Sequence, residues 1–153
     1  MSPAPRPHHQ RAVGRIFHRL ASHLDANPVG EVFVSPVDVR FPSLADPVQP
    51  DVVFIAAGRG EMVTERWIEG VPDLIVEVLS PGNPQHDRKV KFDVYARGGV
   101  REYWIVDPAA RIIEVYVLRG QAFACVAAFE PDAQVRSEVL PELPLVVGDV
   151  LPA

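Results

Sequence analysis

PDLIVEVLSP, the stretch at residues 72–81, is an apolar run that predicts a buried β-strand, yet it carries the carboxylate of Glu77 in its interior. A buried carboxylate is costly unless a metal ion, a cation or a proton compensates its charge. A second apolar run, VVFIAA at 52–57, begins directly after Asp51. If these two strands are antiparallel neighbours, the start of one meets the end of the other, and Asp51 and Glu77 share one patch of the sheet.

Such a pair of acids points to a cation. Two ionised carboxylates about 4 Å apart repel each other by roughly 4 kcal/mol at an effective dielectric constant near 20, which corresponds to about three pKa units. Either one carboxyl group stays protonated or a divalent cation neutralises both. Mg²⁺ prefers few carboxylates together with several waters, and a cation held in this way polarises a phosphoryl oxygen and acidifies a bound water. Asp51 and Glu77 therefore suggest metal-dependent cleavage of a phosphodiester.

A lysine on the next predicted helix, which we expect from about residue 84 to 97, completes this constellation. At 100° per residue, Lys91 lies at the edge of the apolar face that contains Val90 and Val94, whereas Lys89 lies on the solvated face. Lys91 can therefore reach a site beside the strands. There it would orient the attacking water or stabilise the charge that develops on the phosphate.

Each of these residues also has a purely structural interpretation. Asp87 and Lys91 are four residues apart and can form a surface ion pair worth about 0.3–0.5 kcal/mol. Asp51 can close a turn after a proline, and Glu77 can lie at an exposed sheet edge. Signals for other chemistries are missing from the sequence: it has no glycine-rich phosphate loop ending in Lys-Ser/Thr, no Cys/His metal spacing and no nucleophile elbow.

Length and composition narrow the class of protein. The chain has 153 residues, 48% of them hydrophobic, which predicts a single domain over 1–153 with a sizeable core. The net charge of −5 argues against a protein that mainly wraps nucleic acid, but not against an enzyme that meets phosphate through a cation. No stretch reaches the ~20 apolar residues of a membrane span. The single Cys125, interpreted as a packed thiol, fits a reducing compartment, so we expect a cytoplasmic protein without a membrane partner.

The rest of the pattern predicts an α/β order of helix, three strands, helix, strand and an added C-terminal hairpin. Residues 1–8 are rich in proline and should form an irregular lead-in. Apolar residues then recur at steps of three and four from 13 to 24, which predicts a helix from about residue 10. The first strand is expected at 31–41, with an edge or a bulge at Pro36. Later elements are expected as a strand at 101–106, a hairpin of 112–118 and 122–128, and a short terminal strand with a tail within 135–151.

Three segments together resemble one known family. They are PDVVF at 50–54, PDLIVEVLSP at 72–81 and KFDVYARGGVREYWIVDP at 91–108. In these segments the chain is similar to the Uma-two family of bacterial endonucleases, which belongs to the restriction-endonuclease-like PD-(D/E)XK superfamily. The resemblance spans roughly residues 7–150. It implies a restriction-endonuclease-like core with a mixed sheet flanked by helices, and divalent-metal-dependent hydrolysis of DNA phosphodiester bonds.

The family motif assigns roles to particular residues. By this resemblance, Asp51 and Glu77 hold Mg²⁺ or Mn²⁺, and Val78 adds its backbone carbonyl. The superfamily's usual lysine position, two residues after the glutamate, is Leu79 here. In this family a lysine from the following helix replaces it, in a Lys-x-x-x-Tyr pattern that selects Lys91, the lysine that the helical phase also selects.

The resemblance also implies DNA as the substrate, and a homodimer fits it because superfamily nucleases often pair two sites to cut two strands. By the resemblance, we expect a further segment before the family's SPAP…HQ stretch, which here lies at residues 2–10, and its lack in this sequence reflects either a misplaced start or a real loss. Together with the acidic net charge, this leaves two alternatives open. One is a catalytically inactive interaction module that keeps the nuclease fold, and the other is a phosphodiesterase acting on a small nucleotide.

Overall fold

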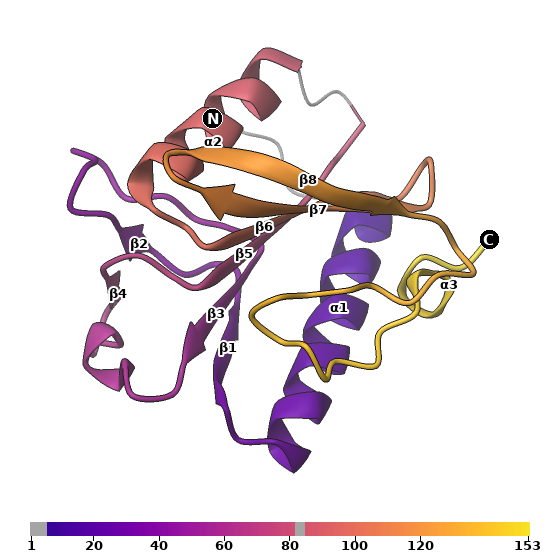
Figure 1. Ribbon diagram of the computed structural model, residues 1–153, viewed down its shortest axis with the longest axis horizontal. Helices are drawn as coiled ribbons and strands as arrows, with labels where there is room; N and C mark the ends of the chain where they lie inside the picture. The colour runs from indigo at the N-terminus through magenta and orange to yellow at the C-terminus, as the bar shows by residue number, and fades with distance from the viewer. Residues whose placement is uncertain (1–5, 82–84) are drawn as a thin grey trace.

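A six-stranded mixed sheet forms the centre of the molecule, in the order β1-β3-β5-β6-β7-β8, and a separate two-stranded parallel sheet joins β2 and β4 (Figure 1). The computed structural model describes residues 6–81 and 85–153. Along the chain the elements are α1 (Pro7–Ala26), β1 (Gly30–Val34), β2 (Val39–Arg40), β3 (Val52–Ala56), the 3₁₀ turn η1 (Gly60–Met62), β4 (Ile68–Glu69), β5 (Leu74–Val78), α2 (Gln85–Gly98), β6 (Glu102–Asp107), β7 (Ile112–Arg119), β8 (Ala122–Phe129) and α3 (Val147–Val150). The expected α/β class, with a mixed sheet and a C-terminal hairpin, is confirmed.

Both faces of the central sheet are covered. Because side chains alternate along a strand, Leu74 and Val76 of β5 join one apolar cluster and Ile75 joins the other. The first cluster lies under α1 and the C-terminal segment, and the second lies under α2 and the small sheet, as Figure 1 shows from the sides on which these elements sit. Glu77 has the parity of Ile75, so it lies on the α2 face.

Helix α1 forms because its apolar residues recur at helical spacing and pack on the sheet. Its buried apolar side chains are those of Ala12, Val13, Ile16, Leu20 and Leu24. The expected irregular lead-in is wrong for its last two residues, because Pro7 already opens the helix. A proline is tolerated in the first turn, where its missing N–H would have no partner in any case. Residues 1–5 lie outside the described part.

The predicted strand at 31–41 is in fact two strands in different sheets. β1 ends at Val34, and β2 starts only at Val39, beyond Pro36. Proline cannot donate a hydrogen bond to a strand ladder, so the chain leaves the sheet around Pro36, as the sequence predicted. β1 is an edge strand of the large sheet. The expected terminal strand is also wrong. Among the described residues, the region holds an isolated bridge between Gln134 and Val146, followed by the single turn α3.

The hairpin of β7 and β8 is confirmed, with Gly120 at a φ of 68° in its turn. The interpretation of Cys125 as a packed thiol is wrong. β8 is the last strand of the sheet, and Cys125 is exposed on it. No helix among the described residues combines the length and the apolar content needed to cross a membrane.

A buried carboxylate ties the C-terminal segment to the sheet. Glu102, at the start of β6, is fully buried on the face that α1 covers. It accepts hydrogen bonds from four donors, which are Trp104 Nε1 (2.8 Å), Ser137 Oγ (2.5 Å) and the backbone N–H groups of Glu138 (2.7 Å) and Val139 (3.3 Å). Three of the four donors belong to the segment after the hairpin, so Glu102 fixes how that segment crosses the sheet.

Candidate active site

The two predicted acids meet across neighbouring strands. β3 and β5 are antiparallel, and Val52 lies opposite Val76, so Asp51 comes level with Glu77. The backbone N–H of Asp51 donates to Glu77 Oε1 (3.1 Å), and the backbone N–H of Val78 donates to Asp51 Oδ2 (2.7 Å). Each strand thus holds the carboxylate of the other in place, and neither acid lies at a sheet edge.

Helix α2 brings two further side chains to Glu77. Lys91 Nζ lies 2.8 Å from Glu77 Oε2, and the hydroxyl of Tyr95 donates to the same oxygen at 3.4 Å. The Lys91 side chain is 51% exposed, whereas that of Glu77 is 7% exposed, so the lysine reaches the buried acid from the solvent side. Lys89 is exposed. The side chain of Asp87, the alternative partner of Lys91, lies outside the described part.

Burial governs the electrostatics of Glu77. It raises the pKa of the Glu77 carboxyl above its usual value, the ammonium group of Lys91 opposes that rise, and the charge of Asp51 adds to it. Burial, together with the negative charge of Glu77, also raises the pKa of the Tyr95 phenol. Tyr95 therefore stays protonated and donates to Glu77. In this arrangement a lysine and two hydrogen-bond donors stabilise the buried acid.

Comparison with known proteins identifies the family of the chain. The family model described as "Uma2: Putative restriction endonuclease" matches residues 1–148. The chain belongs to the Uma2 family. No curated protein matches the sequence.

A solved structure shows the same fold as this Uma2 chain. It is the crystal structure of a "putative nuclease belonging to DUF820" from Anabaena variabilis ATCC 29413, with a TM-score of 0.80 and 21% sequence identity. The match covers 99% of this chain and 84% of that one. The restriction-endonuclease-like architecture expected from the sequence is therefore shown by the fold as well as by the family.

One residue of the site in this Uma2 chain was missed by the sequence reasoning. His9, in the first turn of α1, is buried, and its Nε2 lies 3.4 Å from Asp51 Oδ2. Its Nδ1 is buried and has no hydrogen-bond partner among the described residues. The available signal was its position four residues before Val13, which continues the apolar stripe of the helix backwards.

A second buried carboxylate, that of Asp73, lies on the same face of the sheet as Glu77 but does not belong to the site. Asp73 shares the parity of Glu77 but precedes the strand, at its opposite end. Arg59 and Arg101 lie 2.9 and 3.5 Å from its Oδ1, and the backbone N–H of Ala56 donates to its Oδ2 at 2.7 Å. Two guanidinium groups neutralise Asp73, so its role is to hold β3, β5 and the loop after β3 together.

The donor set of the Uma2 site suits a hard cation. Asp51 is partly exposed, and within the described residues its Oδ1 accepts no hydrogen bond, so one carboxylate oxygen is available to a ligand. Among residues 6–81 and 85–153, no three His, Cys, Asp or Glu side chains are grouped as a metal site. Two carboxylates and a backbone carbonyl match an ion that keeps most of its waters, as Mg²⁺ does. The metal roles of Asp51, Glu77 and Val78 stay predictions.

Proposed function

We propose that this protein is a metal-dependent endonuclease that hydrolyses DNA phosphodiester bonds, with Asp51 and Glu77 holding Mg²⁺ or Mn²⁺ and Lys91 assisting attack at the phosphate. The observation that carries the proposal is the pair of hydrogen bonds by which the strands of Asp51 and Glu77 each orient the other's carboxylate, with the Lys91 ammonium group beside them. Membership of the Uma2 family supports a nuclease in general. Metal dependence is our inference from the site, and DNA as the substrate is what the resemblance to the family implies.

The residues of the chain divide the work between them. Asp51 is oriented by the Val78 N–H and offers its free oxygen to a cation. Glu77 is oriented by the Asp51 N–H and the Tyr95 hydroxyl. The second carboxylate ligand of the metal is therefore held in place before any metal binds. Val78 would supply its carbonyl. When bound, the divalent ion supplies charge for a phosphoryl oxygen and lowers the pKa of a bound water.

Lys91 is placed to act on the substrate from the solvent side. Its ammonium group is already at the site, 2.8 Å from Glu77, and half of its side chain faces solvent. A phosphate that enters there meets a cation oriented by a buried acid, which stabilises the charge that develops during attack. As long as no divalent cation is bound, the same lysine balances the negative charge of Glu77.

The proposal is tested by incubating the purified protein with plasmid and with single-stranded DNA, in Mg²⁺, Mn²⁺ or EDTA. We expect cleavage with either metal and none in EDTA. Glu77→Gln keeps the shape of the side chain but loses a charged ligand, so cleavage should fall about 100-fold or more. Glu65→Gln, an equivalent change at an exposed carboxylate, is the control and should cleave normally.

Calorimetry with Mn²⁺ separates the proposal from its alternatives. The endonuclease should bind Mn²⁺ in a manner that requires both Asp51 and Glu77. A protein that binds no divalent ion and cuts nothing would be the inactive interaction module. Hydrolysis of a small phosphodiester such as bis(p-nitrophenyl) phosphate, with all DNA left intact, would identify the small-nucleotide phosphodiesterase. Wild-type cleavage by Glu77→Gln would refute the site assignment. Light scattering tests the proposed homodimer.

A further inference from the structure

The exposed side of α1 carries a row of basic side chains. Arg11, Arg15 and Arg19 recur every four residues, and His8 precedes them by three. At 100° per residue these four positions fall within about 80° of arc, so they form one stripe along the helix. All four residues are exposed. We refer to His8, Arg11, Arg15 and Arg19 as the α1 basic stripe.

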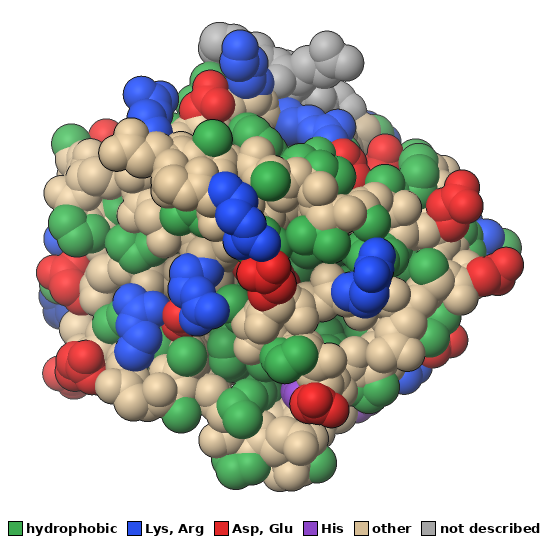
Figure 2. All heavy atoms as spheres, in the orientation of Figure 1, with side chains coloured by type: hydrophobic (Ala, Val, Ile, Leu, Met, Phe, Trp, Pro, Cys, Tyr) green, Lys and Arg blue, Asp and Glu red, His purple; other side chains and the backbone are tan. Residues whose placement is uncertain are grey.

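Among the described residues, no acidic side chain lines the hollow beside Arg11 and Arg15. The helix has a single acidic residue, Asp25, next to its last position. Arg19 lies 4.0 Å from the half-exposed Asp149, whereas the side chains of Arg11 and Arg15 make no ion pair or hydrogen bond among the described residues. On the face shown in Figure 2, by contrast, Lys and Arg side chains alternate with Asp and Glu. In a chain of net charge −5, unbalanced arginines in one row indicate a surface for an anion.

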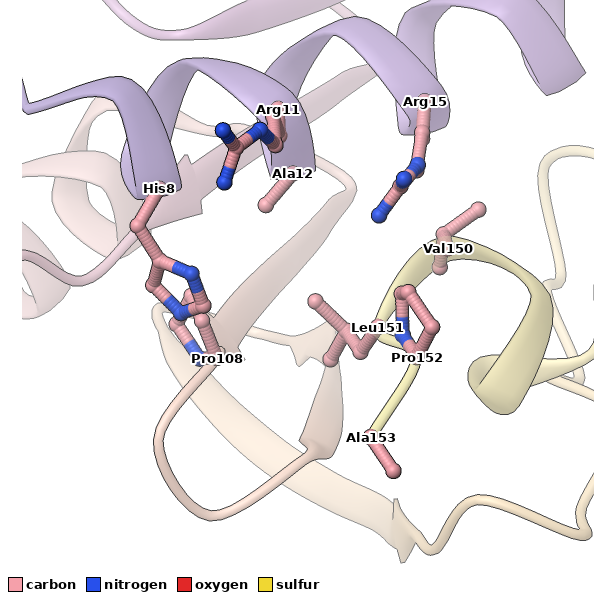
Figure 3. Close-up of a pocket in the computed structure, with 9 residues that line it drawn as sticks. All are labelled: His8, Arg11, Ala12, Arg15, Pro108, Val150, Leu151, Pro152 and Ala153. Atoms are coloured by element: carbon pink, nitrogen blue, oxygen red, sulfur yellow. The ribbon is translucent and has the colours of Figure 1, made fainter.

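The stripe borders a hollow rather than a flat surface. Figure 3 shows the guanidinium groups of Arg11 and Arg15 extending from α1 on the side of the C-terminal residues 150–153, with His8 at one end beside Pro108. The hollow has a volume of about 320 Å³. Guanidinium groups offer planar paired donors that match phosphate oxygens.

The stripe begins at the candidate active site. His8 also lines a second hollow, of about 270 Å³, together with Leu79, Ser80, Arg88 and one acidic residue, Asp107. Leu79 directly follows Val78, whose N–H orients Asp51, and Arg88 is held by Glu114. The next residue after His8 is His9, which contacts Asp51. A polymer that lies across the site can therefore continue past His8 onto Arg11 and Arg15.

The dimensions fit a nucleic acid strand. Four residues of α-helix advance by about 6 Å, so Arg11, Arg15 and Arg19 present charges at that interval, and the stripe from His8 to Arg19 is about 16 Å long. One strand of a DNA duplex advances 3.4 Å per phosphate along the duplex axis, so a stripe parallel to that axis spans about five nucleotides. A small anion would occupy only one of these positions.

We propose that the α1 basic stripe binds the phosphate backbone of the DNA strand that enters the active site. This inference rests on the proposed nuclease function and adds the surface that holds the substrate. The rest of the chain carries a net negative charge, so we expect an acidic polymer to be held along this stripe. The stripe also explains how an acidic protein can take an acidic polymer as its substrate.

The test is the binding of fluorescein-labelled duplex and single-stranded DNA, followed by anisotropy in EDTA, where no cleavage occurs. We expect the double variant Arg11→Gln/Arg15→Gln to bind DNA about tenfold more weakly at low salt, regardless of sequence. The slope of log K against log salt should fall by about 1.8 for the duplex, because two phosphate contacts and their released counterions are lost. The control is Arg66→Gln/Arg97→Gln, which removes two exposed arginines from the loop before β4 and the last turn of α2.

The outcomes separate this inference from the proposed function. Unchanged affinity and salt slope in the stripe variant would refute the stripe, even if cleavage still requires Glu77. Loss of binding in the stripe variant would support it, even if no condition yields cleavage. An equal loss in the control variant would show that only net charge matters and would refute it. Binding to anionic phospholipid vesicles that depends on Arg11 and Arg15, with DNA binding intact, would assign the stripe to a membrane surface instead.

Discussion

Replacing Lys91 with alanine is expected to lower DNA cleavage by a factor of about 10² to 10³ without unfolding the protein, as seen when a single group that stabilises transition-state charge is removed. Lys91 is half exposed, and its ammonium group lies 2.8 Å from Glu77 Oε2. The fold is retained because the Lys91 side chain is half exposed and because Glu77, whose pKa burial already raises and Lys91 lowers, takes up a proton once that ammonium group is gone. The loss should therefore appear in the rate of cleavage and not in the circular dichroism spectrum.

Metal binding should respond in the opposite direction. The Lys91 ammonium lies 2.8 Å from Glu77 Oε2, so it competes with any other cation for that oxygen. Without it, the acid has lost its positive partner, and Mn²⁺ should bind at least as tightly as in the wild type. A variant that cleaves poorly but binds metal well assigns Lys91 to the chemical step and separates it from the metal ligands.

Lys89→Ala is the matched control, because Lys89 lies two residues earlier on the same helix and is exposed. It should retain wild-type cleavage. Lys91→Met keeps most of the aliphatic stem and should be as inactive as the alanine variant, which would show that the charge is what matters. Full activity in both Lys91 variants, or equal losses at Lys89 and Lys91, would remove Lys91 from the mechanism.

The second large effect concerns stability. Glu102→Ala is expected to lower the free energy of unfolding by about 3–5 kcal/mol, because removal of the carboxylate leaves buried donors without an acceptor. The donors include Trp104 Nε1 and Ser137 Oγ, and the N–H of Glu138 loses its partner as well. The measurement is urea denaturation followed by tryptophan fluorescence and circular dichroism.

The exposed Glu142 provides the control, since it lies on the same C-terminal segment. Glu142→Ala should change the free energy of unfolding by no more than about 0.5 kcal/mol. Should Glu102→Ala unfold at the wild-type urea concentration, the hydrogen bonds to Glu102 would contribute nothing to holding the segment on the sheet.

The centre of the fold was predictable because its signals are local. β5 reads as an apolar run, and the alternation along it decides that Glu77 and Ile75 share a face. From the sequence, the antiparallel pairing of β3 with β5 was only a condition, and the structure supplies that pairing and so places Asp51 beside Glu77. The helical phase of α2 likewise selects Lys91 from its own segment.

What the sequence did not reveal depends on packing between distant segments. His9 meets Asp51 only because the first turn of α1 comes to lie at the start of β3, which no local pattern specifies. The apolar run around Cys125 resembles a core strand, but β8 is the last strand of the sheet and has a neighbour on one side alone. The two-residue strands β2 and β4 are too short to leave a periodic signal, so their pairing was missed.

Under the proposed function, the mutual hydrogen bonds of Asp51 and Glu77 make DNA cleavage a reporter of the correct alignment of β3 and β5. Because side chains alternate with a period of two, shifting β3 by a single residue against β5 would turn Asp51 towards the α1 side of the sheet, away from Glu77. A misaligned chain would keep its helices and strands and look native by circular dichroism, yet it would have no catalytic centre. The cleavage activity per molecule therefore measures the fraction of chains in which β3 and β5 pair in the correct register.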